Sequence, residues 1–271
     1  MALDMIAEVA KINAYYKEKR GAERYRCLAY GDKGTGKTTL FATARFPVHI
    51  DCFDPGGSQV IAPEIEKGLI VADTRFEVDD IENPKVFDLW DKEFHRRRKE
   101  GYFNQFATYG VDSFTTLSQV IMNYVLKKQG HAGGIPQTGA GNDNDYVHQM
   151  LHLESSLVGI FSLPCDIIMT AHPEADKDEA SGHMFVGPMI TGKAKIRIPL
   201  LFDEMYYLRV EDTKEGETKW ILQTRPSKIF KASSRLARRG KFDKFEEPNI
   251  KALLKKAGLP YNDLPIPWLK A

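Results

Sequence analysis

The segment 30–39 constrains the fold of this chain more than any other stretch. Gly31 and Gly36 enclose four residues and are followed by Lys37 and Thr38, which is the pattern of a phosphate-binding P-loop. An apolar run before the segment predicts a strand, and the run after it predicts a helix that begins at Gly36 or Lys37 and continues to Ala44. Such a turn points backbone N–H groups at a phosphate, and the helix dipole adds to the attraction. The sequence therefore predicts a nucleotide site rather than a glycine-rich surface turn.

The residue types within this segment assign the expected contacts. Lys37 is expected to bridge the β- and γ-phosphates as a point charge, and the Thr38 hydroxyl is expected to ligate Mg²⁺. The full set of residues expected at the nucleotide is Gly31, Asp32, Lys33, Gly34, Thr35, Gly36, Lys37, Thr38 and Thr39.

The composition is that of an ordinary globular protein. With 271 residues, of which 42% are hydrophobic and 28% charged, the chain can bury a full core. The formal net charge of +1 argues neither for nor against a polyanionic partner. Cys27, Cys52 and Cys165 lie far apart, which predicts small buried side chains in a reducing cytoplasm. No stretch approaches the length of a membrane span, so we expect neither export nor an anchor.

The order of apolar segments predicts an α/β fold. Beyond the strand before the P-loop, strands are expected at 47–51, 69–72, 108–112 and 166–171. Helices between them require right-handed crossovers, and hence a mostly parallel sheet with helices on both faces. Two alternating segments, 202–210 and 219–224, predict antiparallel strands that extend this sheet toward the C-terminus.

The same patterns divide the chain into three parts. Residues 1–23 form an N-terminal helix whose apolar stripe is expected to pack beside the sheet. Residues 24–235 form the nucleotide-binding core. Residues 236–271 form a basic linker, a short helix and a proline-rich tail.

Acidic residues follow two of the expected strands. Asp112 is expected to hold Mg²⁺ through water, because a P-loop needs a carboxylate at the carboxyl end of a nearby strand; a plain helix N-cap is the alternative. Asp51 and Asp54 follow the second strand, and either can position the attacking water. Asp54 is nearer the glycine turn, but an Asx-turn role before Pro55 is also open to it.

Two further segments have a functional and a structural interpretation. The basic run 95–99 predicts either a solvated helix end or a nucleic-acid contact. Residues 130–145 are rich in glycine and show no periodicity. A long loop of this kind inside a compact domain is more often functional or mobile than structural.

In the order of its motifs the chain resembles the core-only RecA-like ATPases of bacteriophages, which are similar to phage single-strand annealing ATPases and through them to RecA recombinases. The resemblance covers roughly residues 24–235. It rests on the P-loop at 31–38, Ile50-Asp51…Asp54…Gly56-Gly57, Val111-Asp112-Ser113, Ile168-Met169-Thr170-Ala171-His172, and Thr224-Arg225-Pro226-Ser227-Lys228 followed by Ser234-Arg235. It implies a RecA-like P-loop NTPase fold with ATP and Mg²⁺.

The resemblance also implies that the fifth strand lies between the P-loop strand and the Asp112 strand. Thr170 and His172 would then lie near the γ-phosphate. His172 would act as a sensor of nucleotide state, where RecA proteins use a glutamine; a histidine that only caps the strand end is the alternative. The catalytic residues expected on this basis are Lys37, Asp54, Asp112 and His172.

The family further aligns 130–145 and 174–192 with the two DNA-binding loops of recombinases. The chain departs from that pattern, because it has Phe53 and Asp54 where recombinases place a glutamate. Its second loop is acidic and would repel a phosphate backbone, with Glu174, Asp176, Asp178 and Glu179. The positive face would come from Lys193, Lys195, Arg197 and 225–241, or DNA would be bound weakly or through a partner.

The expected protein is an ATPase of phage recombination or replication, in the host-cell cytoplasm. It would act on single-stranded DNA as a homo-oligomer, a ring or a filament, with a single-strand-binding protein as a candidate partner. Two alternatives stay open. A small-molecule kinase also uses a P-loop but usually has an arginine-rich lid, and the run 95–99 is the only lid-like feature in the sequence. A nucleotide-switched adaptor is favoured by the missing glutamate.

Because no arginine finger is close to the P-loop in sequence, a basic residue is expected to act across a subunit interface. The candidates are Lys193, Lys195, Arg225, Lys228 and Arg235. The alternative for each is a contact with DNA phosphates or a solvated position on the surface.

Overall fold

The computed structural model describes residues 4–21, 24–130, 143–177, 182–191, 194–213 and 216–269. The strands are β1 (Arg26–Gly31), β2 (Val48–Cys52), β3 (Ile70–Asp73), β4 (Thr108–Asp112), β5 (Asp166–Ala171), β6 (Pro173–Lys177), β7 (Met184–Pro188), β8 (Glu204–Asp212), β9 (Thr218–Gln223), β10 (Ser233–Ser234) and β11 (Phe245–Glu246). The helices are α1 (Met5–Gly21), α2 (Thr39–Ala42), α3 (Ala62–Glu66), α4 (Val86–Lys99), α5 (Phe114–Lys128), α6 (Asp143–Phe161), α7 (Ala194–Arg197), α8 (Arg235–Arg238) and α9 (Ile250–Ala257). Single 3₁₀ turns lie at Gly57–Ile61, Thr74–Phe76, Tyr102–Gln105, Ile198–Leu201 and Pro267–Leu269.

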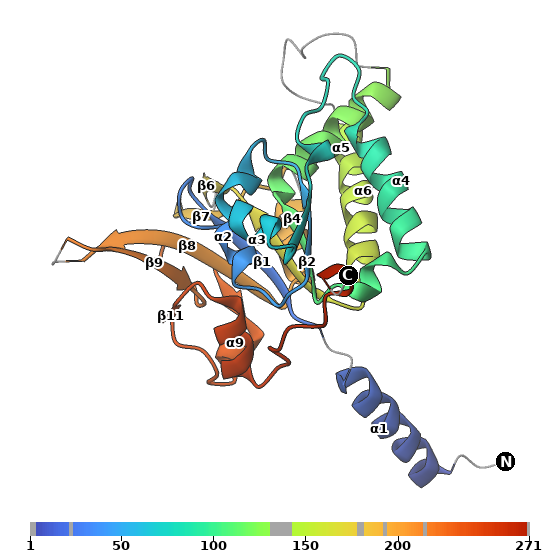
Figure 1. Ribbon diagram of the computed structural model, residues 1–271, viewed down its shortest axis with the longest axis vertical. Helices are drawn as coiled ribbons and strands as arrows, with labels where there is room; N and C mark the ends of the chain where they lie inside the picture. Colours follow the sequence, from blue (N-terminus) through green and yellow to red (C-terminus); the bar gives the residue numbers. More distant parts are fainter. Residues whose placement is uncertain are drawn as a thin grey trace.

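One large sheet with helices on both faces forms the body (Figure 1). Within the described ranges, nine strands pair in the order β11-β9-β8-β1-β5-β4-β2-β3, and β10 also pairs with β8. The run from β8 to β3 is parallel, whereas β9, β10 and β11 are antiparallel to their neighbours. The predicted α/β sheet with an antiparallel C-terminal extension is therefore confirmed. As the resemblance implied, β5 lies between β1 and β4.

The position of β8 differs from the prediction. Instead of pairing only as an antiparallel extension, β8 lies parallel to β1, with Leu208 opposite Gly31. A parallel neighbour needs a crossover connection. The chain between β5 and β8, which includes the β6–β7 hairpin, α7 and the 3₁₀ turn Ile198–Leu201, supplies that crossover. The strand that carries the P-loop is consequently flanked on both sides by parallel strands.

Successive side chains of β1 point to opposite faces of the sheet and pack into two hydrophobic cores. Leu28 and Tyr30 pack on the side of α4, α5 and α6, and Cys27 and Ala29 pack on the side of α2, α3 and α9. All residues of β1 from Cys27 to Gly31 are buried, as expected of a strand covered on both faces. The strand is thereby held rigidly beneath the loop that follows it.

The N-terminal helix α1 does not pack beside the sheet as predicted. Ile6, Val9 and Ile12 are 84%, 50% and 58% exposed, and Figure 1 shows α1 pointing away from the body. The physical reason is that the sheet faces are already covered by the other helices. Within the residues that the structure describes, neither face of the sheet offers α1 an uncovered apolar surface.

Cys27, Cys52 and Cys165 are buried and form no disulfide, as predicted for small core side chains. In the part of the chain that the structure describes, no helix has the length and hydropathy needed to cross a bilayer.

Candidate nucleotide site

The P-loop follows β1 and depends on glycine at three positions. A Cβ added to Gly31 would lie 2.4 Å from the Leu208 carbonyl oxygen, so the close approach of β8 excludes a side chain there. Gly34 and Gly36 both have a φ of 85°, a left-handed conformation that glycine adopts without strain. These positions allow the backbone to turn back over the end of β1.

The helix that follows the loop is shorter than predicted. It spans Thr39–Ala42, whereas the sequence predicted a helix that begins at Gly36 or Lys37 and continues to Ala44. Thr43 Oγ1 donates to Leu40 O at 2.8 Å, and such side-chain bonds compete with helix continuation. A single turn aligns few peptide dipoles. Phosphate binding must therefore rest on the loop N–H groups and on the lysine.

Lys37 is held at the floor of the loop by backbone carbonyls. Its side chain donates from Nζ to Gly31 O at 2.8 Å and to Asp32 O at 2.9 Å, and the residue is 8% exposed. Burial lowers the pKa of Lys37, while the nearby carboxylates of Asp112, Asp54 and Asp32 act in the opposite direction. The ammonium group is thus partly desolvated and paired with dipoles, which leaves its charge available to a phosphate.

Thr38 and Asp112 meet as a metal site requires. Thr38 Oγ1 donates to Asp112 Oδ2 at 2.7 Å, and the hydroxyl of Thr170 on β5 donates to the other carboxylate oxygen. Asp112 is 3% exposed, and burial raises its pKa. The N-cap of α5 is Ser113, whose Oγ accepts from Thr116 N, so the alternative cap role of Asp112 is wrong. Hydroxyl and carboxylate oxygens beside a phosphate loop fit Mg²⁺.

If this carboxylate serves the metal, we expect Asp112→Asn to weaken ATP binding in the presence of Mg²⁺ by about tenfold and to leave binding in EDTA unchanged. Calorimetric titration with ATP under both conditions measures the difference. Thr170→Val, which removes one hydrogen bond but no charge, is the matched control and should cost less. Equal losses with and without Mg²⁺ would show that Asp112 supports the loop through Thr38 instead.

Asp54 and His172 are in contact with each other on the wall of a cleft that opens over the P-loop. His172 Nε2 lies 2.9 Å from Asp54 Oδ2, and Asp54 Oδ1 accepts from Ser113 Oγ at 2.8 Å and from the Thr116 hydroxyl. Burial raises the pKa of Asp54, but the hydrogen bonds from His172, Thr116 and Ser113 outweigh burial and hold the pKa below its usual value. The carboxylate is therefore ionised at neutral pH and acts as an acceptor.

The glycine turn after β2 does not use the Asp54 side chain as an Asx residue. Gly56 N donates to Glu77 Oε2 at 3.1 Å, and the backbone carbonyl of Asp54 accepts from Gly57 N at 3.2 Å. The Asx-turn alternative is therefore wrong, and the carboxylate of Asp54 remains directed to the cleft.

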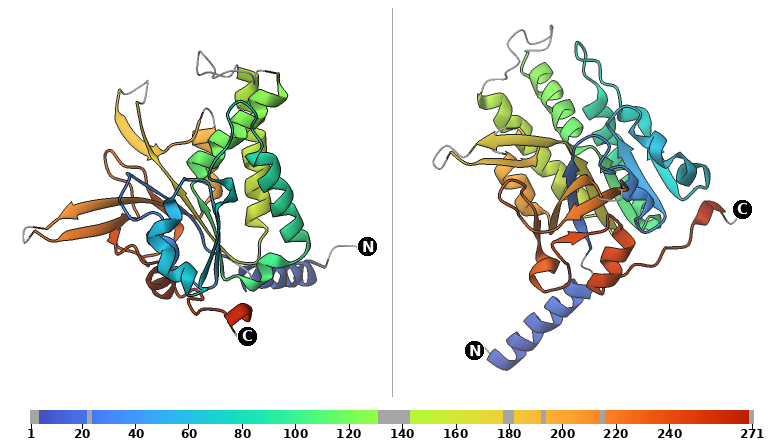
Figure 2. Two further views of the ribbon diagram at one scale, coloured as in Figure 1. Left: turned by 45° about the horizontal axis from the view of Figure 1, so that its top comes forward. Right: turned by 90° about the vertical axis from the view of Figure 1, so that its left-hand side faces the viewer.

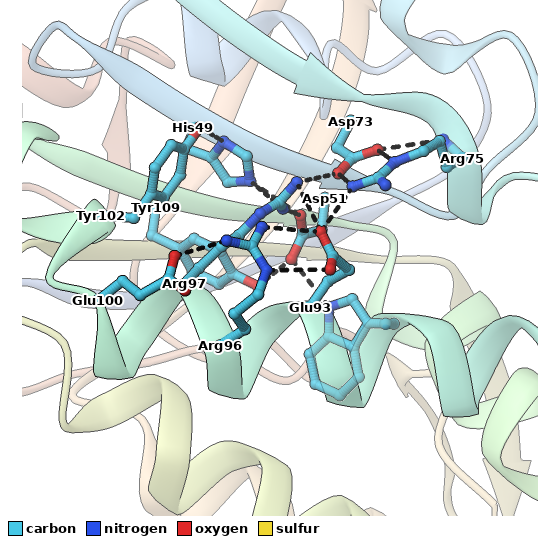
Figure 3. A network of polar contacts seen from close by, with 11 residues as sticks. His49, Asp51, Asp73, Arg75, Glu93, Arg96, Arg97, Glu100, Tyr102 and Tyr109 are labelled. Carbon is cyan, nitrogen blue, oxygen red and sulfur yellow. Dashed lines mark hydrogen bonds and ion pairs between the residues drawn. The ribbon is translucent and has the colours of Figure 1, made fainter.

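Asp51 belongs to a separate buried network (Figure 3). It is 1% exposed. Its Oδ2 accepts from Trp90 Nε1 at 2.8 Å and from Tyr109 OH at 2.5 Å, and its Oδ1 lies 2.9 Å from His49 Nε2. The structure thus separates the two carboxylates that the sequence left open: Asp54 lines the cleft, and Asp51 does not.

The basic run 95–99 ends α4 and pairs with carboxylates. Arg97, whose side chain is 11% exposed, contacts Asp73 Oδ2 at 2.6 Å and Asp51 Oδ1 at 3.5 Å. Arg96 pairs with two glutamates within one turn of it (Figure 3). These contacts favour the helix-end interpretation over a nucleic-acid contact. The same ion pairs hold Arg96 and Arg97 at the helix end, whereas the lid of a small-molecule kinase would need them free to move over the nucleotide.

A cleft of about 880 Å³ opens over the P-loop, within the size range of small-molecule sites. Its walls include the predicted residues Lys33, Gly34, Gly36, Lys37, Thr38, Thr39, Asp54 and His172. Gly31, Asp32 and Thr35 do not line it; the first two hold Lys37 through their carbonyls. Asp112 lies buried behind Thr38.

Three residues have contacts that sequence reasoning missed: Thr116 and Trp220 line the cleft, and Ser113 is buried behind it. Ser113 and Thr116 have the spacing of a helix cap, which concealed their second role as donors to Asp54. Trp220 on β9 donates from Nε1 to Gly34 O at 3.3 Å. No local pattern placed this tryptophan at the P-loop, because only the pairing of β8 with β1 brings β9 there.

Other expected functional segments lie partly outside the described residues, namely 131–142, 178–181 and 192–193, which include Asp178, Glu179 and Lys193. The described ends of the second loop form the β6–β7 hairpin, which projects from the body, as does β8–β9 (Figure 2). Lys195 pairs with Asp176 and Arg235 with Asp203. Four candidates for action in trans lie within the described residues, and none of them lines the cleft of its own chain. They are Lys195, Arg225, Lys228 and Arg235.

The family of the chain follows from a comparison over most of its length. A family model described as an AAA domain matches residues 23–236. The chain therefore belongs to this P-loop NTPase family, and membership makes it a P-loop ATPase.

Two other comparisons add little. No curated protein matched the chain. Among solved structures, an uncharacterised protein from Pyrococcus horikoshii in complex with an unknown peptide is similar, at 8% identity and a TM-score of 0.38, over 76% of this chain and 85% of that one. A likeness of this size says nothing about activity.

Proposed function

We propose that this P-loop ATPase hydrolyses ATP with Mg²⁺ as an oligomer on single-stranded DNA, in phage recombination or replication in the host-cell cytoplasm. The observation that carries the nucleotide part is the convergence of Lys37, Thr38, Asp54 and His172 on one cleft, with Asp112 bonded to Thr38. The DNA part is supported by the order of motifs shared with phage RecA-like ATPases.

Each side chain has a distinct task in the proposed reaction. Lys37 and the loop N–H groups bind the phosphates, and Thr38 and Asp112 would hold Mg²⁺, which neutralises phosphate charge when bound. Asp54, ionised and accepting hydrogen bonds, orients the attacking water. His172 fixes the carboxylate of Asp54 through the 2.9 Å contact.

His172 also stands at the base of the β6–β7 hairpin. Its carbonyl accepts from Met189 N at 2.7 Å, and its N–H donates to Thr115 Oγ1 at 3.0 Å. A shift of His172 on arrival or loss of the γ-phosphate would therefore reach the segment that the resemblance aligns with a DNA-binding loop. This continuity supports a sensor role for His172.

A nucleotide-switched adaptor is the second candidate, and one observation favours it. Phe53 is 0% exposed, so the position next to Asp54 supplies an aromatic core residue instead of an acid. Among the described residues, Asp54 alone brings a carboxylate to the cleft wall. Weak hydrolysis with firm nucleotide binding is the behaviour expected of an adaptor.

Phosphate release from ATP distinguishes these functions, measured with and without single-stranded DNA over a range of protein concentrations. We expect release to be stimulated by DNA and turnover per subunit to rise with protein concentration. Heparin, a polyanion without bases, is the control and should stimulate less. Tight ATP binding without release would support the adaptor, transfer to a small acceptor would support a kinase, and a concentration-independent rate would exclude catalysis across an interface.

A further inference from the structure

Trp220 is an exposed aromatic side chain at the cleft that the phosphate contacts do not require. It is 46% exposed, and it lines the cleft together with Val60 and Pro248. Its Nε1 donates to Gly34 O, and its Cδ1 would lie 3.5 Å from a Cβ on Gly36. The indole ring therefore lies directly against the edge of the P-loop.

The β8–β9 pairing explains why the ring faces this way. Leu208 is opposite Leu222, and Val210 is opposite Trp220, so alternation places all four side chains on one face of the hairpin. Leu208 and Leu222 are 0% exposed within the core, whereas Val210 is 38% exposed. The apolar face thus continues out of the core and ends beside the P-loop as an open platform.

We propose that Trp220 is the stacking platform for the base of the bound nucleotide, an inference that rests on the proposed nucleotide site. The polar groups Lys37, Thr38, Asp54 and His172 occupy the phosphate-binding part of the cleft. The apolar wall formed by Trp220, Val60 and Pro248 is the part of the cleft that is then available to the base. Aromatic rings stack on bases through their π-faces, and this contact needs no reading of the base edge.

Inorganic triphosphate separates stacking from simple support of the loop, because it has the phosphates but no base. We expect Trp220→Ala to weaken Mg·ATP binding by about tenfold and to leave the affinity for Mg·triphosphate unchanged. Trp220→Phe keeps an aromatic face and should retain most of the ATP affinity. Calorimetric titration of both ligands into each variant gives the comparison.

Phe245 provides a matched control. It is an exposed aromatic residue on β11, 43% exposed, and it pairs with Gln223, whose side chain lies on the opposite face of β9 from Trp220. The guanidinium carbon of Arg209 lies 4.6 Å from the centroid of the Phe245 ring. Phe245→Ala should leave the affinity for both ligands unchanged.

Three other outcomes of these titrations would contradict the proposal, and each has a different cause. Equal losses of ATP and triphosphate affinity in Trp220→Ala would mean that the indole only supports Gly34. Unchanged ATP affinity in that variant would remove the stacking role and leave the nucleotide site standing. If the wild-type protein bound neither ligand, the proposed nucleotide site itself would be wrong. As a second readout, ATP should quench tryptophan emission in the wild type and not in Trp220→Phe, since Trp90 is 1% exposed and Trp268 lies on the C-terminal tail.

Discussion

Lys37→Ala is expected to reduce ATP hydrolysis by at least about a hundredfold while the protein stays folded. The proposed role of the lysine is to bind the phosphates, and its described partners are the carbonyls of Gly31 and Asp32. Steady-state phosphate release and calorimetric ATP binding measure the loss. Lys67→Ala, at an exposed lysine outside the cleft, is the control and should behave as wild type.

The same substitution should not lower the melting temperature. Burial lowers the pKa of Lys37, which means that the fold disfavours its charged form through desolvation. Among the described residues it forms no salt bridge whose loss would leave a carboxylate unpaired. Normal turnover in a folded Lys37→Ala protein would contradict the nucleotide site, and a large fall in melting temperature would show that the lysine chiefly supports the loop.

Asp54→Asn is expected to lower turnover by about 10²- to 10⁴-fold while Mg·ATP binding is retained, because the role proposed for this carboxylate is to orient the attacking water. Asparagine keeps the size of the side chain and an oxygen that accepts from Ser113. Single-turnover hydrolysis, with binding measured separately, gives the two quantities. Retained turnover would show that another group positions the water and that the Asp54–His172 pair has no catalytic role.

Asp51→Asn is the matched control and should give the opposite profile. Asp51 accepts from Trp90 and Tyr109 and lies against Arg97 in the buried network. Loss of its charge should lower the free energy of unfolding by roughly 2–3 kcal/mol. Turnover per folded molecule should stay near that of the wild type, because Asp51 does not line the cleft.

The parts of the site that the sequence predicted are those with a local signature. The P-loop is a contiguous motif, and a carboxylate at the end of a parallel strand must lie at the same edge of the sheet as that loop. These two facts are sufficient to bring Thr38 and Asp112 together. The separation of Asp51 from Asp54 could also have been predicted, because alternation puts His49 and Asp51 on one face of β2, and Phe53, just beyond the strand, lies on the same side, toward α4.

The parts that the sequence missed depend on packing between distant segments. The helix α1 has an apolar stripe, but the stripe does not say that other helices already cover the sheet. The strand β8 has the pattern of a hairpin strand, which its pairing with β9 satisfies, and its parallel contact with β1 has no separate signature. Trp220 reaches the P-loop only as a result of that contact.

The location of β1 between β5 and β8 sets the order in which the chain can fold. Cys27 pairs with Ile168 on one side and with Glu204 on the other, and contacts of such long sequence separation form slowly. During synthesis, the whole P-loop motif leaves the ribosome long before either neighbour of β1 exists. Until then β1 presents an unpaired apolar edge, a species prone to aggregation. The nucleotide site is therefore among the last features to form, although its motif is among the first to be translated.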